Sequence, residues 1–187
     1  MGAAMNIVQT PIQGLMVVDA ELHSDHRGAF ARLYCQQELQ EIIGSRQIVQ
    51  INQSCTRTVG AVRGLHYQQS PHAEMKLIRC LKGKVWDVTV DLRYGSPTFL
   101  SWHAEELSES NKRMMVIPEG CAHGFQVLEE DSELLYLHTA FYASSSEGGV
   151  QPMDPMLAIS WPLSIQDLSD RDRSHPLLSS DFAGLIV

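Results

Sequence analysis

The 187-residue sequence lacks any apolar run approaching 18 residues, so no segment is predicted to span a membrane. Its first residues show no charged stretch followed by a long apolar one, and we expect no secretory signal. Clusters of lysine and arginine are also missing. Together with a net charge of −8, this argues against nucleic acid as a partner, because phosphate binding needs grouped cations.

Cysteine is scarce and scattered. The four cysteines show no Cys-x-x-Cys spacing, which indicates free thiols in a reduced, cytoplasmic protein. Cys55 and Cys80 fall in strand-like segments and are expected to be small core or half-buried residues.

The motifs of several large enzyme classes are absent. No Gly-x-Gly-x-x-Gly or P-loop occurs, so a dinucleotide or ATP fold is not expected. No Gly-x-Ser-x-Gly occurs and no cysteine stands in an electropositive turn, which leaves little support for nucleophilic catalysis. The remaining composition is 44% hydrophobic and 19% charged, and it predicts one globular domain over residues 1–187 with residues 1–5 as a disordered start.

Short strand-like segments dominate the chain and predict an all-β fold. Such a chain forms a sandwich, a jelly roll or a barrel. A strand over 15–22 is followed by a polar turn at 24–28, a single helix is predicted over 36–43, and residues 82–83 are predicted to form a tight hairpin. The polar tail 167–178 is expected to be a loop that closes one mouth of the barrel. The further predicted strands are 47–56, 61–68, 75–81, 84–92, 99–107, 113–117, 124–128 and 134–141.

The most informative stretch is 63–68 (RGLHYQ) with the nearby 74–77 (EMKL). It sets His66 and Lys76 close together on what is predicted to be one hairpin face. A titratable imidazole beside a cation suits a general base next to a group that stabilises an enolate. The pair therefore indicates proton abstraction next to a carbonyl without a cofactor. A hydrogen-bonded structural histidine and a lysine at a solvated edge remain the alternative.

A metal site is the competing interpretation of these histidines. Many metal-binding β-barrels use two histidines two residues apart, but Gln68 stands two residues after His66, and His72 follows Pro71 in a predicted loop. We therefore expect no metal. On the neighbouring strand Asp87 is predicted to orient a histidine or to pair with a lysine.

Two further segments carry polar side chains onto strands. The turn at 118–125 delivers His123, either to a site or to the surface. Because side chains alternate along a strand, Tyr136, His138 and Tyr142 are predicted to share one face. A tyrosine stripe is ordinarily core packing, although a buried tyrosine near a lysine can also donate a proton.

These motifs together resemble the dTDP-4-dehydrorhamnose 3,5-epimerase family of cupin-fold sugar-nucleotide epimerases. The resemblance covers about residues 19–178. It is carried, in order, by residues 25–30 (DHRGAF), 50–54 (QINQS), 63–68 (RGLHYQ), 76–77 (KL), 90–93 (VDLR), 95–98 (GSPT), 117–120 (IPEG), 122–125 (AHGF), Tyr136, Tyr142, 161–162 (WP) and 168–172 (LSDRD).

The resemblance implies a homodimeric cupin-type jelly roll that acts on a 4-keto-6-deoxy nucleotide sugar without metal or cofactor. His66 would abstract the proton, and Asp172 would orient the His66 imidazole. Lys76 would stabilise the enolate oxygen, and Tyr136 would deliver a proton from the opposite face. These roles give an isomerase that converts dTDP-4-dehydro-6-deoxy-D-glucose into dTDP-4-dehydro-L-rhamnose by inverting C3 and C5.

The resemblance also implies the residues that bind the substrate, and an arm around Arg27 and Phe30 that reaches into the partner's site. The positions near the diphosphate are matched by Arg27, Arg63 and Arg171, and those near the nucleotide by Gln50, Asn52 and Arg32. Tyr142 matches the aromatic residue that stacks on the thymine. His123 and Glu147 match further substrate contacts.

The sequence departs from the family pattern at several of these positions. Arg32 stands where the family often has glutamate, and Cys121 replaces a common phenylalanine. After Tyr136, Leu137 takes the place of a common lysine and is followed by His138. The departures leave open which base, which sugar, and whether one or both carbons are inverted. A mono-epimerase acting on a related 4-keto sugar is the nearest alternative. From other classes, a metal-dependent cupin oxygenase and a non-catalytic sugar-nucleotide binding module remain.

Overall fold

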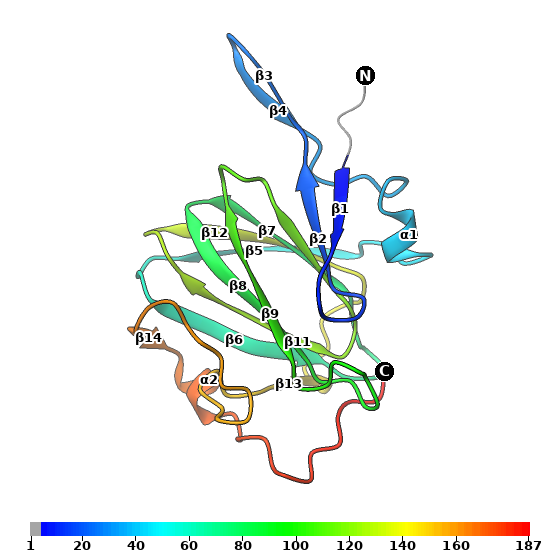
Figure 1. The fold of residues 1–187 in the computed structure, drawn as a ribbon, viewed down its shortest axis with the longest axis vertical. Coiled ribbons are helices and arrows are strands. Elements are labelled where there is room, and N and C mark those ends of the chain that lie inside the picture. Colours follow the sequence, from blue (N-terminus) through cyan, green and yellow to red (C-terminus); the bar gives the residue numbers. More distant parts are fainter. Residues whose placement is uncertain (1–4) are drawn as a thin grey trace.

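The computed structural model describes residues 5–187 and consists mainly of two packed antiparallel β-sheets (Figure 1). This confirms the all-β prediction. The first sheet has the order β1 (Met5–Gln9), β2 (Met16–Ala20), β10 (Met114–Ile117), β7 (Lys76–Lys82), β12 (Ser132–His138) and β5 (Gln50–Thr56). The second has the order β13 (Glu147–Gly149), β6 (Ala61–Gln68), β11 (Cys121–Val127), β8 (Lys84–Asp91) and β9 (Trp102–Ser108), with β14 (Asp167–Leu168) parallel to β6.

The space between the sheets is apolar at one end and polar at the other. Alternation along β7 sends Ile78 and Cys80 into a core that Phe125 of the opposite sheet also enters. The same inward-facing series begins with Lys76 on β7. On β12 it continues from the apolar Leu134 to Tyr136. The polar end of the interior is therefore where a site can form.

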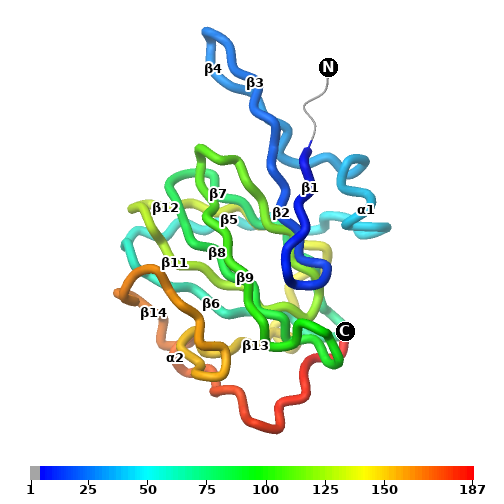
Figure 2. The backbone as a smooth tube through the Cα atoms, in the orientation of Figure 1, coloured from blue at the N-terminus to red at the C-terminus, as the bar shows by residue number. Residues whose placement is uncertain are grey.

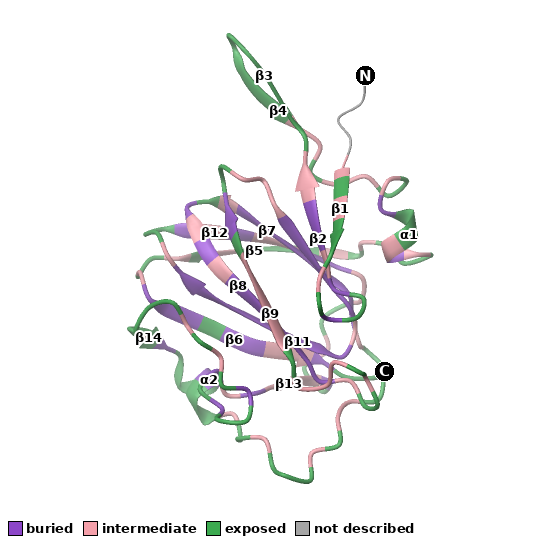
Figure 3. Cartoon of the chain, in the orientation of Figure 1, coloured by how far each residue is buried: buried purple, intermediate pink, exposed green. Residues whose placement is uncertain are grey.

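Part of the outer face of each sheet is also covered. The helix α1 (Gln40–Ile43) and the residues before it cover the first sheet, where Leu39 and Ile43 pack against Leu77 and Leu137. The second sheet is covered by the chain after β13, which packs on Leu65 and neighbouring residues. Burial is greatest in the central strands of both sheets (Figure 3). Among the described residues no helix has the length and apolar character needed to cross a membrane.

A hairpin stands apart from both sheets. Its strands, β3 (Leu22–Asp25) and β4 (Gly28–Ala31), pair with each other and project from the body of the molecule (Figures 1 and 2). Nearly every residue of the hairpin is exposed, including Phe30 with 66% of its surface. At the base of the hairpin, Leu22, Ala29 and Ala31 line a small pocket together with Leu81 of the body.

Two predicted hairpins are wrong. Residues 82–83 were expected to join paired strands, but β7 and β8 lie in different sheets, and Gly83 carries the chain from one to the other. His66 on β6 and Lys76 on β7 likewise lie in opposite sheets rather than on one hairpin face. They meet because the sheets face each other.

Other boundaries shift by several residues. The helix is one turn, α1, rather than 36–43, and the predicted strand 15–22 ends at Ala20. The predicted polar turn 24–28 is present but shorter, as residues 26–27 that join β3 to β4. The tail predicted as a loop contains β14 and a second helix, α2 (Asp170–Ser174), beside β6. Met5 is the first residue of β1, and residues 1–4 of the predicted disordered start lie outside the described residues.

The thiols were predicted only partly correctly. All four cysteines are free; Cys80 is buried as expected, but Cys55 is exposed. Cys55 lies on β5, the edge strand of its sheet, where alternate side chains face solvent.

Candidate active site

A cavity of about 960 Å³ occupies the polar end of the interior. Strands of both sheets line it, and the segment of β14 and α2 closes one side next to β6 (Figure 1). The residues that the sequence singled out and that line this cavity are Asn52, Arg63, His66, Lys76, His123, Tyr136, His138, Tyr142, Glu147, Arg171 and Asp172.

A histidine–carboxylate pair stands on one wall of the cavity. His66 Nε2 lies 2.6 Å from Asp172 Oδ1, although 106 residues separate them in sequence. Asp172 is held by its own surroundings: Gly64 N–H donates to Oδ2 at 3.2 Å, and the Asp172 N–H donates to Ser169, the N-cap of α2. Burial opposes the ionisation of Asp172, but the hydrogen bond and charge of His66 outweigh it, and the pKa of Asp172 lies below its usual range.

The backbone two residues before His66 requires a glycine, which Gly64 provides. Its backbone φ of 118° is rarely adopted by residues that carry a side chain. A Cβ at this position would also lie 2.6 Å from Cα of Gly124. This close approach of β6 and β11 coincides with a register shift between His123 and Phe125. The irregular pairing sets His66 opposite His123 in the ladder.

Lys76 projects from the opposite sheet toward this pair. Its ammonium donates to the carbonyl oxygen of His66 at 3.2 Å and lies 3.4 Å from Oε1 of Glu74. Glu74 in turn contacts His138, with 2.8 Å between Oε2 and Nδ1. All three side chains are almost fully buried, so this charge lies in a wall of low polarisability where its effect on a bound carbonyl is strong.

Tyr136 lies next to the apolar core, opposite Ile78 in the β7–β12 ladder, whereas Lys76 is opposite His138. Burial raises the pKa of Tyr136 to about 12, so its hydroxyl keeps its proton at neutral pH. That hydroxyl is 3.0 Å from Oγ of Ser54, and the tyrosine ring contacts His123 edge to face. His123 is 2.8 Å from Asp87, whose pKa is raised by complete burial. The prediction that Asp87 orients a histidine is confirmed.

Charged and aromatic side chains ring the mouth. Arg171 of α2 pairs with Glu147 at 2.7 Å, and the hydroxyl of Tyr142 donates to the same carboxylate at 2.8 Å. Tyr142 lies beyond the end of β12, so its predicted alignment with Tyr136 along one strand is wrong. Gln50 is not among the cavity residues, but its side-chain oxygen accepts from the Tyr142 N–H at 3.1 Å. Arg63 also lines the cavity, so two guanidinium groups are available to an anion.

The remaining predicted binding residues lie outside the cavity. Arg27 and Phe30 belong to the projecting hairpin, where Arg27 pairs with Asp25 at 2.7 Å. Arg32 follows that hairpin and pairs with Glu38. The described residues that line the cavity of this chain do not include Arg27, Phe30 or Arg32.

Among the described residues, one cluster has the residue types of a metal site. Ligand atoms of His66, Asp172 and His175 lie within 4.8 Å of one another. The contact of 2.6 Å between His66 and Asp172 is the length of a charge-assisted hydrogen bond. Two atoms bound to one tetrahedral zinc lie about 3.3 Å apart. The cluster therefore fits a shared proton better than a shared ion.

The arrangement suits proton transfer at a carbon next to a carbonyl. The Asp172 contact holds one nitrogen of His66 and leaves Nδ1 as the basic atom. Lys76 supplies a positive charge for an enolate oxygen, and Tyr136 holds a proton on the opposite sheet.

Comparison with known proteins assigns this chain to a family. The family model described as dTDP-4-dehydrorhamnose 3,5-epimerase matches residues 9–180. The chain belongs to the dTDP-4-dehydrorhamnose 3,5-epimerase family. The predicted resemblance and its cupin-type jelly roll are thereby confirmed.

Named relatives of this epimerase family match nearly end to end. A dTDP-4-dehydrorhamnose 3,5-epimerase of Salmonella typhimurium is 42% identical over 93% of this chain and 96% of its own. A dTDP-4-dehydrorhamnose 3-epimerase of Streptomyces niveus is 37% identical over 90% and 81%. The crystal structure of a dTDP-6-deoxy-D-glucose-3,5-epimerase of Legionella pneumophila with dTDP-4-keto-L-rhamnose superimposes with a TM-score of 0.87, at 40% identity over 92% of both chains.

Sequence reasoning did not assign four residues of this epimerase site. Glu74 and Ser54 stood within the stretches 74–77 and 50–54 but were given no role, and they acquire partners only when β5, β7 and β12 pair. Ser169 was seen as part of a motif, and its position before an acidic first turn is a helix N-cap signal. His175 packs beside Asp172 and His66 from the tail, where burial lowers its pKa.

Proposed function

We propose that this chain is a cofactor-independent isomerase that inverts C3 and C5 of dTDP-4-dehydro-6-deoxy-D-glucose, giving dTDP-4-dehydro-L-rhamnose for deoxysugar biosynthesis. The observation that carries the proposal is the His66–Asp172 pair, at 2.6 Å, facing a cavity that also holds Lys76 and Tyr136. These groups supply a base, a cation and an acid around one enclosed space.

The chemistry follows from the acidity of carbons that flank a carbonyl. His66 takes the proton from C3 or C5, and Asp172 balances the imidazolium that forms. The electron pair of the C–H bond passes into an enolate whose oxygen faces Lys76. Tyr136 returns a proton to the other face of the carbon, which inverts it. A general base contributes about 10²–10⁴-fold to such a step.

The nucleotide part of the substrate fits the mouth of the cavity. Arg63 and Arg171 offer planar donors to diphosphate oxygens, and Glu147 holds Arg171 in place. Tyr142 is exposed at 58% and offers a face on which the thymine can stack. Asn52, Gln50 and His123 complete the proposed contacts.

We further propose a cytoplasmic homodimer in which the projecting hairpin completes the partner's site. The hairpin carries Arg27 and Phe30 away from its own body and leaves them exposed, which supports a role in contact with a second copy. Arg32 lies at the base of the same hairpin. Four free thiols are compatible with a reducing compartment.

The product tests this function. Purified protein is incubated with dTDP-4-dehydro-6-deoxy-D-glucose, and proton couplings in the NMR spectrum give the configuration at C3 and C5. Inversion at both carbons is expected. Inversion at C3 alone would instead establish the activity that the name of the Streptomyces niveus relative describes. Recovery of unchanged substrate would favour a binding module, and a product containing added oxygen would favour an oxygenase.

A further inference from the structure

A third histidine–carboxylate pair, after His66–Asp172 and His123–Asp87, lines the same cavity and has no part in the reaction described above. His138 Nδ1 lies 2.8 Å from Oε2 of Glu74, and both side chains are about nine-tenths buried. Burying a charged carboxylate is costly unless it is paired and hydrogen-bonded. A pair of this kind in the wall of a reaction cavity indicates a role in the reaction.

The position of His138 relative to the other groups is specific. It belongs to β12 in one sheet, whereas His66 belongs to β6 in the other. Its ring is nearly parallel to that of Tyr136, with 6.2 Å between the ring centres and 13° between the planes. The wall opposite His66 therefore carries two proton-bearing side chains next to each other.

Both nitrogens of His138 have a defined environment. Nδ1 faces the Glu74 carboxylate, which can balance the charge of an imidazolium. Nε2 lies 3.4 Å from the side-chain nitrogen of Asn52. An asparagine amide can turn either its oxygen or its nitrogen toward such a ring, so this contact can accept a proton on Nε2.

We propose that His138, supported by Glu74, is a second proton donor that completes the inversion of one of the two carbons, while Tyr136 serves the other. The inference rests on the proposed function, because a reaction at two carbons needs a proton delivered twice to the face opposite His66. Two adjacent donors on one wall match the two carbons on either side of one carbonyl.

Inversion by His66 and His138 consumes no proton overall. His66 takes a proton from the carbon, and the C–H electron pair forms the enolate at the oxygen near Lys76. The carbon then takes the proton of Nε2 from the His138 imidazolium, and the electron pair returns to form the new C–H bond. His138 regains a proton from water as His66 loses one to water, so no proton is consumed.

Glu74 links this donor to Lys76. One of its oxygens contacts His138 and the other lies 3.4 Å from the Lys76 ammonium. An effect through Lys76 acts on the enolate oxygen that both carbons share, whereas an effect through His138 acts on one carbon. The ratio between the two carbons therefore isolates the part played by His138.

The experiment compares inversion with hydrogen exchange at each carbon in deuterated water. The variants are His138→Gln, Glu74→Gln and, as a matched control, His103→Gln, which removes a histidine that pairs with Glu105 on β9 outside the cavity. For His138→Gln we expect inversion at one carbon to fall by about 100-fold, the lower end of the range of general acid catalysis. Inversion at the other carbon and deuterium uptake at both should stay within about threefold, because His66 still removes the proton.

The outcomes separate this inference from the function on which it rests. Glu74→Gln should lower inversion at the same carbon more than at the other, and His103→Gln should behave as the wild type. Equal losses at both carbons, unchanged inversion at both, or loss of exchange together with inversion in His138→Gln would overturn the inference. If His138→Gln misfolds, every rate falls alike and its thermal midpoint is lowered. The comparison of inversion at the two carbons in Glu74→Gln then tests the inference. Wild-type protein that does not invert both carbons would instead overturn the proposed function, and this inference with it.

Discussion

Replacing His66 with asparagine removes the base while leaving its surroundings in place. Asp172 keeps the Gly64 N–H at 3.2 Å and its position at the start of α2, since both contacts are independent of the imidazole. Lys76 contacts the backbone oxygen of residue 66 and not its side chain, so its ammonium also stays where it is.

The expected losses in rate and in stability differ greatly. General base catalysis of about 10²–10⁴-fold corresponds to about 3–5 kcal/mol in the activation free energy. The side chain of His66 is one-third exposed, and its loss breaks one hydrogen bond to a charged group, which costs the folded state at most about 3 kcal/mol. A domain with about 5–15 kcal/mol of stability remains folded after that change.

Single-turnover conversion of the 4-keto sugar nucleotide measures the rate, and urea unfolding measures the stability. We expect His66→Asn to unfold cooperatively and to invert both carbons at least about 100 times more slowly than the wild type. A variant that is folded and turns over within about threefold of the wild type would refute the assignment of His66 as the base.

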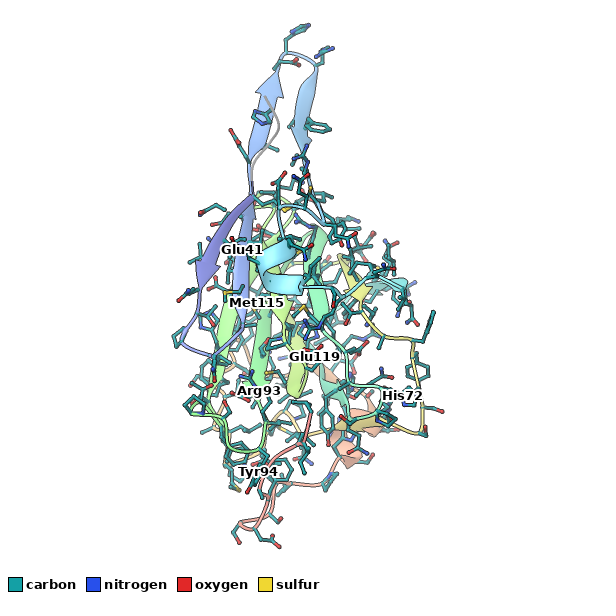
Figure 4. All side chains as sticks on the ribbon, turned by 90° about the vertical axis from the view of Figure 1, so that its right-hand side faces the viewer. Glu41, His72, Arg93, Tyr94, Met115 and Glu119 are labelled. Atoms are coloured by element: carbon teal, nitrogen blue, oxygen red, sulfur yellow. The ribbon has the colours of Figure 1, made fainter. Side chains whose placement is uncertain are left out.

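Three further predictions concern other parts of the molecule. Lys76→Gln should lower the inversion rate at both carbons by about 10²–10³-fold, because a buried cation next to the enolate oxygen is lost, and equal rates in the variant would exclude that role. Asp91 is fully buried, and burial opposes the ionisation of its carboxyl group. Hydrogen bonds from Arg93 (labelled in Figure 4), Ser96 and Thr98 outweigh this effect and lower the pKa of Asp91 from 3.8 to about 2. The depressed pKa stabilises the fold above about pH 4, and this contribution, on the order of 2 kcal/mol, is lost as the pH falls toward 2. Urea unfolding should therefore find Asp91→Asn less stable than the wild type at pH 6 by about that amount, with a smaller difference at pH 3, and a difference that does not depend on pH would contradict this account. Phe30→Ala should leave the thermal midpoint unchanged within about 2 °C, because its ring is exposed in its own chain, and should raise KM several-fold if the hairpin enters the partner's site; an unchanged KM would remove the hairpin from the site.

The sequence predicted those features that depend on local pattern. The strand 61–68 has the predicted bounds, since alternation and flanking turns define a strand without reference to its partners. Asp87 also pairs with a histidine as predicted, because it faces inward on a strand with an alternating pattern.

Features that depend on which strands pair could not be predicted from single residues. Lys82 and Gly83 have the composition of a hairpin turn, yet the chain crosses there to the other sheet, and turn composition does not distinguish the two outcomes. The contact between His66 and Asp172 spans 106 residues and was expected from the family resemblance alone. Glu74 and His138 become partners only through the pairing of β7 with β12, which brings the end of one strand beside the start of the other.

Deuterium incorporation at C3 and C5 of dTDP-4-dehydro-6-deoxy-D-glucose, followed by NMR in deuterated water, tests the central claim most directly. The claim is that the His66–Asp172 pair removes a proton from each carbon next to the C4 carbonyl. We predict that the wild-type protein incorporates deuterium at both carbons and that His66→Asn incorporates it at neither over the same period. Conversion of the sugar without deuterium at C3 and C5, or undiminished incorporation by His66→Asn, would contradict the account.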